Sequence, residues 1–150
     1  MTTMTAESVE NLMMRVTQEI RVRASLEKTF AALLEELGPE SQRPDGTSMQ
    51  MKLEEWPGGR WYRDLGDGKG HYWATVQSYK PPVLLEFCGP LMMSSPVTNN
   101  VIYRLSEEGG ETVIRFNHTA FGPIQPDHRE GVNKGWGYIH SRVRERAERG

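Results

Sequence analysis

The chain contains a single cysteine, Cys88, among its 150 residues. One cysteine excludes an internal disulfide framework and any zinc site that needs several thiolate ligands. No histidine pair has HxxxH spacing, and the sequence has neither a P-loop nor a GxSxG nucleophile elbow. We therefore predict no metal and no cofactor. Because Cys88 ends an apolar stretch, we expect it to be a small buried side chain.

Long hydrophobic runs are also absent. No segment approaches the roughly 18 apolar residues of a membrane span, and the first residues lack the basic start and apolar core of a signal peptide. These absences predict a cytoplasmic protein without a membrane span. A surplus of positive charge is missing as well, since 18 Lys and Arg residues face 20 Asp and Glu residues. Nucleic acid is therefore not an expected partner.

Alternation of apolar and polar residues predicts the first part of the secondary structure. Residues 16–24 alternate strictly, which is typical of a strand in a sheet with one solvated face. Ser25 can cap a helix whose apolar residues fall at helical spacing until Gly38 and Pro39 end it. The chain therefore begins with a strand and then a helix.

The remainder predicts an α+β fold. Short turns separate further strands, which we place at residues 49–56, 60–65, 71–80, 83–88, 97–106 and 112–120. A long helix begins near Pro126. Three glycines within it suggest either close approach to a backbone or ligand, or a late or kinked start: Gly131, Gly135 and Gly137. Because one face of the sheet needs a cover, we expect a helix-grip, in which a curved antiparallel sheet of about six to seven strands wraps around this helix and leaves a ligand cavity. We place a loose tail at residues 1–12 and one domain at residues 13–150.

Four short motifs resemble those of a known family. They are "PGGR" at 57–60, "KPPVLLEF" at 80–87, "FNHTAFG" at 116–122 and "GWGYIHSRV" from Gly135. In their order and spacing the chain resembles the START-like helix-grip superfamily called SRPBCC, in the branch named after the activator of heat-shock protein 90 ATPase. The resemblance covers about residues 14–147. It departs at Gly89, where the family often has an aromatic residue, and in a short stretch between the first helix and the second strand. The resemblance implies the helix-grip fold and a cavity for hydrophobic ligands.

Polar residues that fall in phase with the apolar strand faces are candidates for the cavity, because burying an unpartnered polar group costs about 1–3 kcal/mol. There are four, with Arg63 as a possible fifth: Gln18, Glu55, Asn99 and His118. His118 follows Ile114 and Phe116 on one strand face. It is either a cavity hydrogen-bonder or general acid/base, since histidine titrates near neutral pH, or a histidine satisfied by its neighbours.

Two further features of the strands leave alternatives open. Glu55 and Arg63 flank the turn at residues 56–60 and predict a cross-strand ion pair, either at the cavity mouth or as an ordinary surface pair. Residues 71–79 alternate poorly. Either Trp73 or the set of Tyr72, Ala74 and Val76 faces inward.

Three hypotheses of function follow. The first is a binding protein for a hydrophobic or aromatic small molecule. The residues expected to line its site are Gln18, Glu55, Trp61, Arg63, Trp73, Phe87, Asn99, Tyr103, Phe116, His118, Trp136 and Ile139. The second, which the resemblance implies, is an enzyme of the polyketide cyclase/aromatase type with His118 as acid/base. The third is a protein that contacts a chaperone. The sequence permits a monomer or a homodimer.

Overall fold

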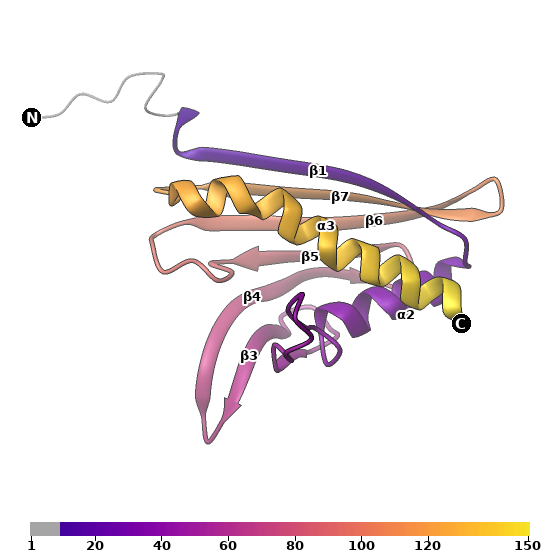
Figure 1. The fold of residues 1–150 in the computed structure, drawn as a ribbon, viewed down its shortest axis with the longest axis horizontal. Coiled ribbons are helices and arrows are strands. Elements are labelled where there is room, and N and C mark those ends of the chain that lie inside the picture. Colours follow the sequence, from indigo (N-terminus) through magenta and orange to yellow (C-terminus); the bar gives the residue numbers. More distant parts are fainter. Residues whose placement is uncertain (1–9) are drawn as a thin grey trace, which may run out of the picture.

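The computed structural model describes residues 10–150, in the order strand, helix, six strands and helix (Figure 1). The elements are β1 (Met13–Val22), α2 (Leu26–Leu37), β2 (Met51–Leu53), β3 (Arg60–Gly66), β4 (Lys69–Lys80), β5 (Leu84–Gly89), β6 (Thr98–Glu108), β7 (Glu111–Phe121) and α3 (Pro126–Arg149). Most of the loose tail predicted for residues 1–12 lies outside the described residues. At its end, Arg129 of α3 donates hydrogen bonds to the carbonyls of Asn11 and Met13.

The strands form one antiparallel sheet in the order β1-β7-β6-β5-β4-β3-β2. Consecutive strands from β2 to β7 are neighbours, as the short turns predict, and β1 closes the sheet beside β7. The sheet curves so that β3 and β4 swing away from the plane of the other strands, while α3 crosses the concave face (Figure 1). The predicted α+β helix-grip is therefore confirmed.

Local signals explain where the two helices begin and end. The Ser25 hydroxyl accepts a hydrogen bond from the Lys28 amide and caps α2. Pro126 lies in the first turn of α3, where its missing N–H has no partner to lose. α3 runs without interruption from Pro126 through its three glycines, so the predicted late start is not observed. None of the helices in residues 10–150 is long and apolar enough to cross a membrane.

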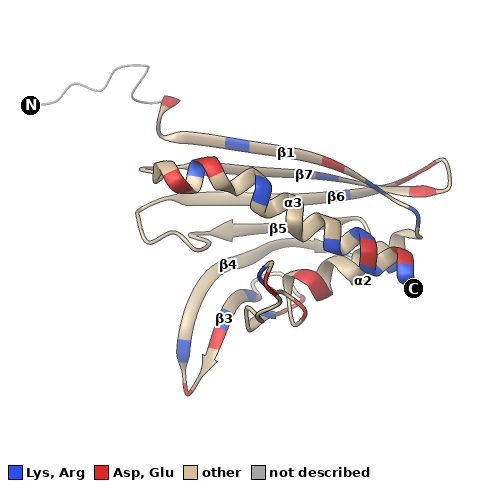
Figure 2. Cartoon of the chain, viewed as in Figure 1, with Lys and Arg blue, Asp and Glu red and all other residues tan. Residues whose placement is uncertain are grey.

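The side chains of α2, of α3 and of the inner sheet face make one core. Its largest fully buried members come from β3, β5, β6 and β7: Trp61, Phe87, Tyr103 and Phe116. α3 packs most closely on α2 and on β1, at one side of the sheet. Acidic and basic residues are mixed along β1 and along α3 (Figure 2).

A β-bulge decides the orientation of residues 71–79. Trp61 of β3 pairs with Ala74 and Tyr62 pairs with Tyr72, so Trp73 is the extra residue of the bulge. Trp73 and Ala74 are therefore both buried, whereas Tyr72 is 47% exposed. The bulge explains why this segment alternates poorly in the sequence.

Three expectations about single elements are wrong. The strand predicted at residues 49–56 is only Met51–Leu53, and Glu55 lies beyond it as an exposed residue. The predicted Glu55–Arg63 ion pair is replaced by Glu54 with Arg60, whose Nε and NH2 groups each lie 2.9 Å from a carboxylate oxygen. Cys88 is exposed, because β5 turns Leu85 and Phe87 inward and its own side chain outward.

Gly89 at the end of β5 lies against the neighbouring strand β4. A Cβ atom at this position would lie 2.4 Å from the Trp73 carbonyl oxygen and 2.6 Å from the Ala74 Cα. The Gly89 carbonyl accepts a hydrogen bond from the side-chain amide nitrogen of Asn99, at 3.1 Å. The absent side chain therefore allows β4 and β5 to approach closely.

Candidate functional site

A cavity of about 1190 Å³ opens between the sheet and α3. Residues from the end of α2, the loop 39–50, β3, β4, the loop 90–97, β7 and α3 line it. Its apolar lining side chains include Leu37, Met49, Trp61, Trp73, Leu91, Val132, Trp136 and Ile139. A smaller cleft of about 500 Å³ lies at the loop 92–95 and the start of α3. In size the larger cavity exceeds what a typical small ligand requires.

An aromatic cluster makes the sheet side of the cavity rigid. Trp61 stacks on Phe87 with ring centroids 4.7 Å apart and meets Trp73 edge to face at 5.1 Å. The Trp61 indole N–H donates to the Leu37 carbonyl at 2.7 Å, which satisfies the last turn of α2. Because its one polar atom is used in this way, Trp61 can lie almost fully buried, 2% exposed, as an apolar support of the cavity wall.

His118 lies fully buried in β7, where both of its ring nitrogens have protein partners. The Trp136 indole N–H donates to Nδ1 at 3.0 Å, and Nε2 lies 2.7 Å from the Asn99 side-chain oxygen. An indole nitrogen can only donate, so Nδ1 is unprotonated and Nε2 carries the proton. Burial lowers the pKa of His118 to about 4, and repulsion from His128 adds to the shift. The imidazole is therefore neutral near pH 7.

His140 of α3 is held in the same way, although nothing in the sequence analysis singled it out. Gln18 donates through its amide nitrogen to Asn133, so its oxygen faces His140 Nδ1 at 2.6 Å. His140 Nδ1 consequently donates, and Nε2 accepts from the Tyr103 hydroxyl at 2.9 Å. Burial lowers the pKa of His140 to about 3 and raises the pKa of Tyr103 well above its ordinary value. This chain of hydrogen bonds joins β6, α3 and β1.

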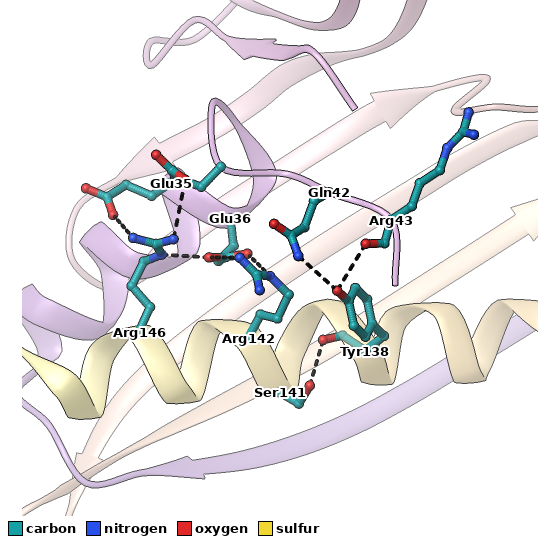
Figure 3. A network of polar contacts seen from close by, with 9 residues as sticks. Glu35, Glu36, Gln42, Arg43, Tyr138, Ser141, Arg142 and Arg146 are labelled. Atoms are coloured by element: carbon teal, nitrogen blue, oxygen red, sulfur yellow. Dashed lines mark hydrogen bonds and ion pairs between the residues drawn. The ribbon is translucent and has the colours of Figure 1, made fainter. Parts of the chain in front are cut away.

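The cavity mouth is polar and carries more positive than negative charge. Its formally charged lining residues are three cations and one carboxylate: Arg43, Arg63, Lys134 and Asp127. Tyr138 of α3 bridges the mouth, because its hydroxyl donates to the Arg43 carbonyl at 3.2 Å and lies 3.4 Å from the Gln42 amide nitrogen (Figure 3). The loop 39–50 is therefore tied to α3 beside the opening.

The residues expected at a ligand site divide into three groups. Six line the cavity: Trp61, Arg63, Trp73, His118, Trp136 and Ile139. Five others lie behind the lining, in the core or in its hydrogen bonds: Gln18, Phe87, Asn99, Tyr103 and Phe116. Glu55 is exposed and outside the lining. In residues 10–150, no cluster of three His, Cys, Asp or Glu side chains is arranged to hold a metal ion.

Comparison with known families agrees with this architecture. The sequence profile of the family described as "Activator of Hsp90 ATPase homolog 1-like protein" matches residues 23–148. The chain belongs to this family. No protein of curated function matches the sequence significantly.

Several solved structures have a fold similar to that of this chain. Protein MLL2253 from Mesorhizobium loti has a TM-score of 0.68 at 19% identity, covering 90% of this chain and 97% of its own. The Aha1 dimer from Colwellia psychrerythraea has a TM-score of 0.60 at 18% identity, covering 89% and 96%. The di-domain ARO/CYC StfQ from the steffimycin biosynthetic pathway has a TM-score of 0.64 at 13% identity, covering 95% of this chain and 51% of its own. At these identities the likeness shows a shared fold.

The sequence patterns did not predict many of the residues that line the cavity. Residues of the loop 39–50 have no periodicity that would have placed them at the opening. In α3, by contrast, Gly131 and Gly135 do line the cavity, and a Cβ atom at either position would have no neighbour within 4 Å. The glycines at these two positions are therefore not explained by close approach to another backbone.

Open space beside these two glycines has a measurable consequence for stability. We expect Gly131→Ala and Gly135→Ala each to raise the free energy of unfolding by about 0.5–1 kcal/mol, because alanine costs less entropy in a helix and meets no clash. Gly110→Ala is the opposite control, since Gly110 has a φ of +81° that alanine rarely adopts. Urea unfolding measures all three, and a destabilised Gly135→Ala would contradict the open geometry.

Proposed function

We propose that this protein binds a hydrophobic or aromatic small molecule in the cavity between the sheet and α3. One observation supports the proposal above the others: an open cavity of about 1190 Å³ with an apolar, aromatic interior. A large concave surface with apolar and aromatic walls is typical of a ligand-binding site. The rigid cluster around Trp61 supports a preformed site, because its rings are locked by mutual packing and by a hydrogen bond.

Binding accounts for the buried histidines better than catalysis does. A general acid or base needs a nitrogen within reach of the substrate proton and a second titratable group beside it. His118 belongs to the cavity wall, yet it is fully buried and both of its ring nitrogens are engaged by Asn99 and Trp136. The cyclase/aromatase alternative draws support from the fold of StfQ and from the place of His118 in the wall. Contact with a chaperone stays a prediction that rests on the family description.

A neutral fluorescent probe tests binding. We expect N-phenyl-1-naphthylamine to brighten on addition of the protein, with a saturable stoichiometry of one, because it would leave water for the aromatic lining. Gly135→Leu should weaken this binding at least about tenfold, since a leucine side chain would occupy the open space of the cavity. The helical backbone at this position accepts leucine, so the variant should remain folded.

The matched control is Arg144→Leu. Arg144 lies on the same helix, is exposed, and is outside the cavity lining. This variant adds the same side chain to the surface and should leave the dissociation constant unchanged. Equal affinities for the wild type, Gly135→Leu and Arg144→Leu would place the probe elsewhere and refute binding in this cavity.

A further inference from the structure

Arg63 stands apart from the other partly buried arginines of residues 10–150. The rest, Arg129, Arg142 and Arg146, use their terminal nitrogens to bind carbonyls or carboxylates. Arg63 donates only through Nε, to the Met49 carbonyl at 3.1 Å. Neither of its terminal NH2 groups forms a hydrogen bond or ion pair with a described residue. The guanidinium is thus oriented by one bond and has unused donors at the cavity wall.

Polar and charged residues line the same cavity as Arg63. His71 is its direct cross-strand neighbour on β4 and also lines the cavity. Arg43 and Lys134 lie on the lining too, against Asp127 as the one acidic lining residue. The whole chain has a net charge of −2. The cavity lining therefore carries a net positive charge, whereas the whole chain carries a net negative charge.

Apolar walls with an unpaired arginine at one side match a ligand with two parts. The planar guanidinium fork fits the two oxygens of a carboxylate, and its bonds to a charged acceptor are stronger than bonds to a neutral one. A partly buried arginine has already lost part of its hydration, and its attraction for an anion is less screened by water and salt than at the open surface. A cationic ligand would meet repulsion from the same groups.

From these observations we propose that the cavity selects apolar molecules with a carboxylate head, such as a fatty acid or an aromatic carboxylic acid, and that Arg63 binds the carboxylate. This inference rests on the proposed function, since it names the class of molecule that the same cavity takes. Arg63 acts here as a specificity-determining residue. The walls around Trp61 and Ile139 contact the apolar part.

Two pairs of competitors test the head group separately from the apolar part. Each displaces N-phenyl-1-naphthylamine from the full chain at pH 7.5, where a carboxylic acid is ionised. The pairs are decanoate with decan-1-ol, and naphthalene-2-carboxylate with naphthalene-2-carboxamide. At least one carboxylate should bind about tenfold or more tightly than its neutral partner. A preference within one pair only supports the proposal and identifies the apolar part as a chain or as a flat ring.

Variants of Arg63 decide whether this residue carries the preference. Arg63→Met keeps the apolar stem and should abolish the preference, because the carboxylate loses its charged partner. Arg63→Lys should keep part of it, because the charge remains without the fork. Arg104→Met is the control, since Arg104 is an exposed strand arginine outside the lining.

The possible failures are distinguishable. Equal binding of charged and neutral partners to the wild type, or a preference that persists in Arg63→Met, would overturn the inference while leaving cavity binding intact. Failure of the probe and of every competitor to bind saturably would overturn the proposed function and the inference together.

Discussion

Lowering the pH from 6.5 to 5 is expected to reduce the free energy of unfolding by about 3 kcal/mol through His118 and His140 alone. Their pKa values are lowered in the folded chain from 6.5 to about 4 and about 3. On unfolding, both side chains regain the ordinary value and take up protons between these limits. The unfolded state therefore binds more protons, and stability is present above pH 6.5 and is lost as the pH falls toward the folded values.

The physical reason lies in the hydrogen bonds of each ring. Protonating His118 would place a proton on Nδ1, where the Trp136 N–H already donates. Protonating His140 would place one on Nε2, where the Tyr103 hydroxyl donates. Each charged ring would lose a bond and remain buried without a counter-ion, which is costly. Burial also lowers the pKa of His128, which adds a contribution of the same sign.

Urea unfolding at half-unit steps from pH 7 to pH 4.5 measures the effect. His118→Gln should remove the uptake of about one proton on unfolding. The slope of the free energy of unfolding against pH should then fall by roughly 1.4 kcal/mol per pH unit. Glutamine can both accept and donate at this position, so the variant should fold, although less stably. Gln77→Ala is the control, since Gln77 is an exposed strand residue without a titrating group, and it should leave the slope unchanged. A flat profile for the wild type between pH 6.5 and 5 would contradict the neutral, buried assignment.

Glu36→Gln is expected to lower the free energy of unfolding by about 3 kcal/mol, because it breaks a buried ion pair between the two helices. Glu36 lies on α2 with 2% of its side chain exposed. It accepts from Arg142 Nε at 2.8 Å and from Arg146 Nε at 2.6 Å, as Figure 3 shows. Losing the carboxylate leaves two arginines facing one another. They keep 22% and 24% of their side-chain exposure, which puts the cost at the low end for such a change.

Glu35→Gln is the matched control, one residue away. Glu35 also pairs with Arg146, at 3.2 Å, but 53% of its side chain is exposed. Its loss should change stability by less than about 0.5 kcal/mol. The double variant Glu36→Gln with Arg142→Met should be less destabilised than the sum of the single changes, because the surplus positive charge is removed. Equal effects of Glu35→Gln and Glu36→Gln would show that burial does not decide the strength of this pair.

Much of the fold could be predicted from local patterns. The alternation at residues 16–24 and in β6 and β7 correctly placed Gln18, Asn99 and His118 on the inner face. The capping signal at Ser25 and the proline of α3 marked both helix starts. Such signals are legible because they depend on residues that are neighbours in the sequence, whose spacing fixes which way each side chain points.

The failures have a different origin. The strand at 49–56 was overestimated because alternation continues past Leu53, while the partner strand allows pairing only from Met51 to Leu53. Trp73 could not be oriented, since a bulge depends on the register between β3 and β4. The role of Glu54 in place of Glu55 follows from the same early end of β2.

By itself, the sequence determined which faces of the strands and helices are apolar, and therefore that a sheet must close over the last helix. Spacing along one chain is sufficient for this. Only the tertiary structure decided which inward polar groups are already satisfied. His118 and His140 are saturated by Asn99, Trp136, Tyr103 and Gln18, whereas Arg63 keeps donors open to the cavity. Hydrogen-bond partners come from strands and helices far apart in sequence, so only their packing reveals whether a polar residue is structural or available to a ligand.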